Sequence, residues 1–77
     1  MMYRDRRGWG FKVRRGLAAD GGEPPYKGFF NKKGPYAEIG WHGVRTLPWR
    51  ESRAAAKKDL DAYAEKKKML IASVIDE

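Results

Sequence analysis

The fold is decided by residues 26–63, YKGFFNKKGPYAEIGWHGVRTLPWRESRAAAKKDLDAY, in which strand-like segments give way to a helix-like one. The first part has short apolar runs between Gly and Pro turn signals, a pattern typical of antiparallel strands. From about Pro48 the apolar residues recur every three, four or seven positions, which is the period of a helix. An antiparallel meander of three or four strands packed against one C-terminal helix is therefore expected, which is the α+β class.

We expect four strands in this chain, over residues 9–15, 26–30, 36–41 and 44–47. In the first of them the apolar residues alternate with cations, which predicts a strand with one buried face and one basic face. Residues 16–25 are rich in Gly and Pro and are expected to form a loop. We predict a four-residue hairpin loop that places Gly34 at positive φ, and a two-residue turn at His42 and Gly43.

One helix is expected over about residues 49–68, with Thr46 as its candidate cap and Pro48 in its first turn. The tail, residues 69–77, begins with the apolar run MLIASVI, whose pattern fits a helix extension or another strand equally well. A domain this small cannot bury the whole run. We therefore expect the tail to cover the sheet edge or to form a homodimer contact.

The net charge of +7 lies entirely in the first fifty residues, which hold eleven Lys or Arg and four acids, whereas residues 51–77 hold six of each sign. The basic half also carries all three Trp and all three Phe. Cations interleaved with aromatics are typical of a surface that binds a polyanion. Residues 1–8, MMYRDRRG, show no periodicity and are expected to be a flexible basic arm in front of a single domain over residues 9–77.

The composition argues against several other classes of protein. The chain has no Cys and only one His, His42, so we expect no disulfide, no metal site and no cofactor. No Gly-rich phosphate loop or paired nucleophile and base is present, so we do not expect an enzyme. No apolar run is long enough to span a membrane, and the N-terminus does not resemble a secretory signal. The absence of Cys fits a cytoplasmic protein.

The candidate nucleic-acid contacts divide by chemistry. Arginine can bind guanine through two hydrogen bonds, so the candidates for base-edge contacts are Arg14, Arg15 and Arg45. Lysine neutralises phosphates, and the candidates for that role are Lys12, Lys27, Lys32 and Lys33. The candidates for contacts from the expected arm are Arg4, Arg6 and Arg7.

The aromatic residues are expected to be mostly internal, because a small domain needs its rings in the core. This applies to Trp9, Phe11 and Trp41, and Trp49 is expected to pack the start of the helix against the sheet. Phe29 differs, since it alternates with Phe30 and one of the two must point away from the helix. An outward Phe29 is a candidate for contact with a base or for anchoring a protein partner.

The order of elements across residues 26–63, together with the stretch RTLPWRESRAAAKKDLDAY at 45–63, resembles the arm-type DNA-binding domain at the N-terminus of phage and transposon tyrosine integrases. The plant ethylene-response DNA-binding domain has a similar fold. In this resemblance Leu47 matches the apolar end of the last strand. The positions that match the helix face are Ala55, Ala56 and Leu60. The family inserts its sheet into the major groove, so the resemblance implies contacts from Lys27, Phe29 and Arg45.

The leading functional hypothesis is a small non-catalytic protein of phage or mobile-element type that binds duplex DNA through a basic sheet face. The alternative is a phage-borne inhibitor or adaptor that binds a host defence or nucleoprotein complex, because a basic face also fits an acidic protein groove. RNA binding through stacked aromatic rings is a third hypothesis.

Overall fold

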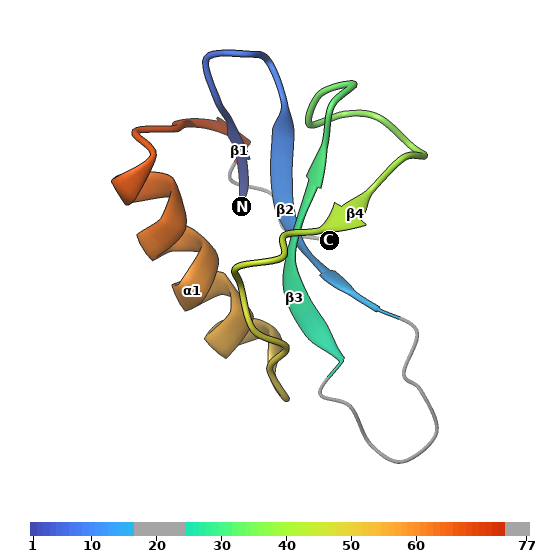
Figure 1. Ribbon diagram of the computed structural model, residues 1–77, viewed down its shortest axis with the longest axis vertical. Helices are drawn as coiled ribbons and strands as arrows, with labels where there is room; N and C mark the ends of the chain where they lie inside the picture. The colour runs from blue at the N-terminus through green and yellow to red at the C-terminus, as the bar shows by residue number, and fades with distance from the viewer. Residues whose placement is uncertain (17–24, 74–77) are drawn as a thin grey trace.

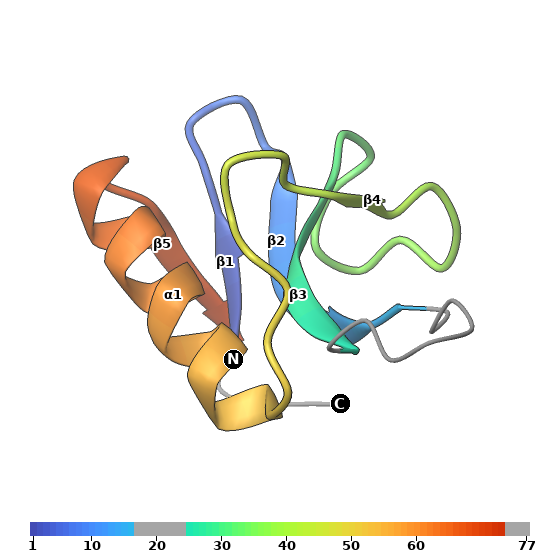
Figure 2. The same ribbon diagram turned by 60° about the horizontal axis from the view of Figure 1, so that its bottom comes forward.

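The computed structural model describes residues 1–16 and 25–73. Its elements in chain order are β1 (Met2–Arg4), β2 (Gly10–Arg15), β3 (Tyr26–Asn31), β4 (His42–Gly43), α1 (Arg53–Lys66) and β5 (Leu70–Ser73). The strands form one antiparallel sheet in the order β4-β3-β2-β1-β5. The helix lies along one face of this sheet (Figures 1 and 2). The predicted α+β class is confirmed, with five strands in place of three or four.

The pairing of β2 with β3 sets which side chains share a face. Phe11 lies opposite Phe30, and Lys12 lies opposite Phe29. Because side chains alternate along a strand, Phe11 and Phe30 point toward α1, whereas Lys12 and Phe29 point to the helix-free face. The alternation predicted for residues 9–15 is therefore present, and Phe29 is the outward member of its pair.

The core lies between the sheet and the helix. Its helical contribution comes from Ala56, Leu60 and Ala64, which recur every four residues along α1. The sheet and the segment after β4 supply the rest of the buried set, which is Tyr3, Phe11, Val13, Val44 and Leu47. Packing of one helical stripe on one sheet face leaves the opposite face of the sheet without a covering helix.

The prediction of a flexible arm over residues 1–8 is wrong. Residues Met2–Arg4 form β1, which pairs with both β2 and β5. The Asp5 carboxylate accepts hydrogen bonds from the backbone N–H groups of Arg7 and Trp9 at 2.9 and 3.0 Å, and from the Arg7 guanidinium. Asp5 thus closes the turn between β1 and β2, and the N-terminal residues form a strand that lies between β2 and β5 in the sheet.

The strands predicted at 36–41 and 44–47 are also absent, and His42 and Gly43, predicted as a turn, form β4. The cause is the buried side chain of Asn31. Its Nδ2 donates to the Ile39 carbonyl at 2.7 Å, and its Oδ1 accepts from the Lys33 N–H at 2.8 Å. These bonds fold residues 32–41 into a compact loop in place of a hairpin strand. Gly34 does take the predicted positive φ, at 114°.

The helix begins later than predicted, at Arg53, and its cap is Ser52 rather than Thr46. The Ser52 Oγ accepts a hydrogen bond from the Ala55 N–H at 3.1 Å, as an N-cap residue does. The preceding segment is held extended, because Arg50 and Tyr26 exchange two backbone hydrogen bonds of 2.6 and 2.9 Å. This bridge to β3 prevents Trp49 and Arg50 from joining the helix.

The turn that follows the helix contains a lysine in the left-handed conformation. Lys68 has a φ of 57°, and the Met69 N–H donates to the Ala64 carbonyl across it. Glycine is the usual residue at this position of a helix C-terminus. After it the chain forms β5, so the described part of the tail is a strand that covers the β1 edge. The predicted tail residues 74–77 lie outside the described part.

Replacement of Lys68 by Gly is expected to stabilise the fold. A non-glycine residue in this conformation costs about 1 kcal/mol, which glycine does not incur. Thermal unfolding should therefore show a midpoint about 4–8 °C above that of the wild type. Lys58→Gly, at a regular helical position, is the matched control and should lower the midpoint. A lower midpoint for Lys68→Gly would contradict the account of this helix end.

A buried tyrosine fastens β1 to the helix. The Tyr3 hydroxyl donates to Asp61 Oδ1 at 2.5 Å, and Lys57 Nζ lies 2.8 Å from Asp61 Oδ2. Burial and the bond to Asp61 raise the pKa of Tyr3 to about 12. Burial opposes ionisation of Asp61, yet the bonds from Lys57 and Tyr3 outweigh it and lower the pKa of this carboxyl.

These pKa values predict a loss of stability in alkali. A phenol whose pKa is raised by folding stabilises the protein fully below its unfolded pKa of 10.0, and this contribution disappears as the pH passes about 12. Tyr3→Phe removes the hydrogen bond and should cost about 1 kcal/mol at neutral pH. Urea unfolding of both proteins between neutral pH and pH 12 should show the difference shrinking above pH 10. A difference that stays constant would exclude this coupling.

Candidate nucleic-acid interface

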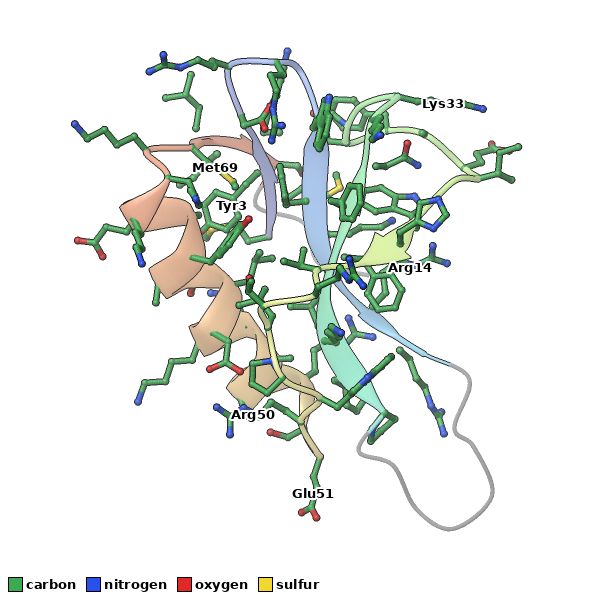
Figure 3. The ribbon with its side chains drawn as sticks, in the orientation of Figure 1. Tyr3, Arg14, Lys33, Arg50, Glu51 and Met69 are labelled. Atoms are coloured by element: carbon green, nitrogen blue, oxygen red, sulfur yellow. The ribbon has the colours of Figure 1, made fainter. Side chains whose placement is uncertain are left out.

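Three cations and three aromatic rings gather on the helix-free face of the sheet. We call this set the cation–aromatic cluster; its members are Lys12, Arg14, Lys27, Phe29, Trp41 and Trp49. All six are partly exposed. Figure 3 shows Arg14 on the side of the sheet opposite α1. The cluster is therefore a solvent-accessible surface and no part of the core.

The two central strands place four of the six members. Lys12 and Arg14 alternate along β2, and their partners across the ladder are Phe29 and Lys27 of β3. Lys12 thus lies opposite the Phe29 ring, and in the next outward pair the two cations Arg14 and Lys27 lie opposite each other. The pleat points all four side chains the same way.

The two tryptophans come from the segments that flank β4. Trp41 directly precedes β4, and its indole N–H donates to the Ala37 carbonyl at 2.8 Å, which fixes it to the loop 32–41. Trp49 directly precedes the Arg50 bridge to Tyr26, so it lies beside Lys27. Neither position follows from strand alternation within β2 and β3.

The rings support the cations. Lys12 Nζ lies 4.6 Å from the centre of the Trp41 ring, and Arg14 Cζ lies 5.8 Å from the same ring. Lys27 Nζ lies 5.1 Å from the centre of the Trp49 ring. Cation–π contacts of this kind restrict flexible side chains without neutralising their charge. A charged ligand would then lose less conformational entropy on binding than at freely moving lysines.

Phe29 contacts Trp49 directly and lies near Arg14, which in turn lies near Trp41. Its ring meets Trp49 edge to face, with centroids 5.9 Å apart, and Arg14 Cζ lies 5.9 Å from it on the side of β2. The ring is thus surrounded by other members of the cluster and keeps only part of its surface exposed. It is placed to contact a bound ligand together with Arg14.

Two cations of the cluster, Arg14 and Lys27, have no ion pair within the described residues. Among the described residues, the side-chain ion pairs join Arg7 to Asp5, Arg50 to Asp59 and Lys57 to Asp61. No carboxylate in these parts of the chain pairs with Arg14 or Lys27. The helix carries two of the three acids used in these pairs. The positive charges of Arg14 and Lys27 are therefore available on the helix-free face, and a surface of this kind attracts anions.

The structure brings four of the eleven predicted contact residues together and separates the others. The cluster holds Lys12, Arg14, Lys27 and Phe29. Arg4, the last residue of β1, alternates with the inward Tyr3 and therefore lies on the helix-free face. Its partner across the ladder is Gly10, against which Pro35 of the loop 32–41 packs, so Arg4 is not a member of the cluster. The remaining six lie at the turns or on the other face. They are Arg6 and Arg7 between β1 and β2, Lys32 and Lys33 after β3, Arg45 after β4, and Arg15 on the helix side of β2.

Two predictions about aromatic residues need correction. Trp41 is not in the core, and Trp49 does not pack the helix start against the sheet; both lie in the cluster. Phe11 is buried as predicted, at 2 % exposure, and Trp9 packs partly buried against Phe30 with ring centres 5.6 Å apart. The tryptophans were missed because their positions depend on the loop 32–41 and on the bridge at Arg50.

The described residues contain no group of three or more His, Asp or Glu side chains that could hold a metal ion. No helix in the same residues is long and apolar enough to cross a membrane. Comparison of the chain with protein-family models, with curated proteins and with solved structures finds no match.

Proposed function

We propose that the protein binds nucleic acid, with duplex DNA as its ligand, through the cation–aromatic cluster. The observation that carries this proposal is the placement of Lys12, Arg14 and Lys27 on one exposed sheet face, each beside a ring. An antiparallel ribbon of this kind fits the major groove, which is about 12 Å wide. The lysines neutralise phosphates, and Arg14 is placed for a bidentate contact to guanine.

Duplex DNA is favoured over single strands by the state of the rings. The Trp41 and Trp49 rings are partly buried and each has a cation above it. Single-strand binders instead present open ring faces on which bases stack. Here the rings act as supports for the cations. The resemblance to arm-type DNA-binding domains implies the same use of a sheet face, and with it a role in a phage or mobile element and a cytoplasmic location.

A titration of fluorescently labelled DNA tests the proposal. The anisotropy of a duplex should rise with protein concentration, and less so for a single strand of the same sequence. If the two lysines neutralise phosphates, affinity should fall about 12-fold between 50 and 200 mM salt. Absence of binding at low salt, or affinity that does not change with salt, would refute the proposal.

A second candidate function is binding to a host protein complex as an inhibitor or adaptor. The observation in its favour is a pair of exposed apolar side chains in the loop 32–41, since Tyr36 is 66 % and Ile39 71 % exposed. Exposed aromatic and aliphatic side chains are typical anchors of protein interfaces. A pull-down from lysate separates the two functions. A partner that remains after nuclease treatment favours protein binding, and one that is lost favours nucleic acid.

We also propose a homodimer that pairs β5 with its counterpart in a second copy. Within the described residues β5 has a neighbour on one side only, and its Leu70 and Ile71 are 76 % and 57 % exposed. The strand carries no charge that would discourage edge pairing. Antiparallel pairing would place the cationic residues 66–68 of one copy toward the end of the other strand, after which the sequence carries Asp76 and Glu77.

Sedimentation of the protein over a concentration series is expected to show this dimer. Leu70→Lys should raise the dimer dissociation constant at least about tenfold, because it replaces apolar contact with like charges. Ile39→Lys changes a similarly exposed apolar residue outside β5 and should have no such effect. A wild-type protein that stays monomeric at every concentration would remove the dimer.

A further inference from the structure

A second group of cations lies at the C-terminal end of α1, apart from the cation–aromatic cluster. The turn between β1 and β2 and the end of α1 lie at the same end of the molecule (Figures 1 and 2). Between them is an open pocket with a volume of about 470 Å³. Its lining includes four cations and two rings, which are Arg6, Arg7, Lys67, Lys68, Trp9 and Tyr63. Figure 3 shows Met69, another lining residue, between the helix end and β1.

The turn between β1 and β2 gives this pocket one rigid wall. The Arg7 guanidinium donates two hydrogen bonds to Asp5, of 2.9 and 2.7 Å, and its Cζ lies 3.5 Å from the centre of the Trp9 ring. The Asp5 carboxylate is therefore fully engaged within the turn. Its charge is balanced by Arg7, so Asp5 does not neutralise the other cations of the pocket.

The remaining three cations give the pocket its charge. Among the described residues no carboxylate forms an ion pair with Arg6, Lys67 or Lys68. Lys67 Nζ lies 5.8 Å from the centre of the Tyr63 ring, so this cation also has an aromatic support. Three cations that converge on one concave site favour an anion with more than one negative charge.

Lys68 supplies an independent observation. Its φ of 57° is the left-handed conformation that glycine adopts without strain, yet the residue here is lysine. The favourable interaction of a lysine with the negative end of a helix is already available from Lys66, which lies in the last helical turn. The strained backbone therefore holds a cation at the pocket, and strain of this kind is concentrated at functional sites.

We infer that this pocket binds the phosphate group of a nucleotide. The three cations match a phosphate monoester, which carries close to two negative charges and three acceptor oxygens. The Trp9 and Tyr63 rings line the same pocket. Because Trp9 already stacks on Phe30 and lies under Arg7, a base or sugar would contact its edge and the Tyr63 ring. The volume lies within the range of small-molecule sites. The ligand is either a free mononucleotide or the terminal phosphate of a nucleic acid strand. The inference does not depend on the cation–aromatic cluster.

Titration of the full chain with adenosine 5′-monophosphate, inorganic phosphate and adenosine tests this inference, with the backbone amide signals followed by NMR. The monophosphate should shift the signals of Arg6, Arg7 and Lys68 and should bind more tightly than inorganic phosphate. Adenosine should bind at least about tenfold more weakly than the monophosphate. Equal affinity for adenosine and its monophosphate, or no shifts at these residues, would overturn the inference.

The variant Lys68→Gly separates binding from folding. It removes one cation and relieves the strained backbone, so the protein should remain folded while the dissociation constant for the monophosphate rises about tenfold. Lys58→Ala removes a helical cation that does not line the pocket and should leave that constant unchanged. Unchanged affinity in Lys68→Gly would overturn the role of Lys68.

Two oligonucleotides of one sequence, with a 5′-phosphate or a 5′-hydroxyl, identify the source of the phosphate. Tighter binding of the phosphorylated strand, lost in Lys68→Gly, indicates a strand terminus. Equal binding of both strands, together with tight binding of the monophosphate, indicates a free nucleotide. Arg14→Gln should lower the affinity for both strands alike and leave the ratio between them unchanged, so a failed nucleic-acid interface on the sheet would not be mistaken for a failed pocket.

Discussion

Replacement of both Arg14 and Lys27 by Gln is expected to weaken binding to duplex DNA about 100-fold at low salt. These residues face each other across β2 and β3, and each lies beside an aromatic ring. Loss of the phosphate contact of Lys27 should reduce the salt slope of the binding constant by about one, and loss of the guanine contact of Arg14 should lower affinity without a change of that size in the slope. Gln keeps part of each aliphatic stem, so the packing against Phe29 and Trp49 is preserved. Anisotropy titrations at several salt concentrations measure both quantities.

The matched control removes two cations from the opposite side of the molecule. Lys58→Gln with Lys66→Gln lowers the net charge by the same amount, on exposed positions of α1. This variant should bind DNA within about twofold of the wild type, because charge far from the interface acts only through screened long-range attraction. An equal loss of affinity in both double variants would show that net charge, and no particular surface, determines binding.

Replacement of Gly10 by Ala is expected to lower the free energy of unfolding by about 3 kcal/mol. A Cβ at this position would lie 2.2 Å from the Pro35 Cα and 2.5 Å from the Gly34 carbonyl carbon. These are backbone atoms, so relief requires the loop 32–41 to lift from the sheet. The thermal midpoint should fall by more than about 10 °C. Because Trp41 ends this loop, the support for Lys12 and Arg14 should be lost as well.

Gly8→Ala is the comparison for this prediction. Gly8 has a positive φ of 86°, but a Cβ there would meet no atom within 4 Å. Only the backbone strain remains, which costs about 1 kcal/mol. A Gly10→Ala protein as stable as Gly8→Ala would contradict the close packing of the loop against β2.

The parts of this fold that could be predicted depend on local pattern. Alternation along residues 9–15 and the Phe29 and Phe30 pair assign the two faces of β2 and β3, because the pleat has a fixed period of two. The helical stripe of Ala56 and Leu60 follows from a period near 3.6. These features predict that Lys12 and Arg14 share one side of β2 and that Lys27 and Phe29 share one side of β3. The register of β2 with β3 then brings both pairs to the same face of the sheet.

The parts that could not be predicted depend on single side chains and distant pairings. Residues 1–8 lack periodicity, yet one carboxylate, Asp5, closes a turn that makes Met2–Arg4 a strand. The side chain of Asn31 replaces the expected third strand by a loop. Since the positions of Trp41 and Trp49 depend on that loop and on the Arg50 bridge, two of the three aromatic rings of the candidate site could not be predicted from local sequence patterns.

The location of bound DNA on the protein can be mapped by an NMR titration with a short duplex. We predict that the amide signals of Lys12, Arg14 and Lys27 and the indole signals of Trp41 and Trp49 shift together, while those of exposed helix residues such as Lys58 do not. Shifts confined to α1 or to the turn between β1 and β2, with the helix-free face unchanged, would contradict this prediction.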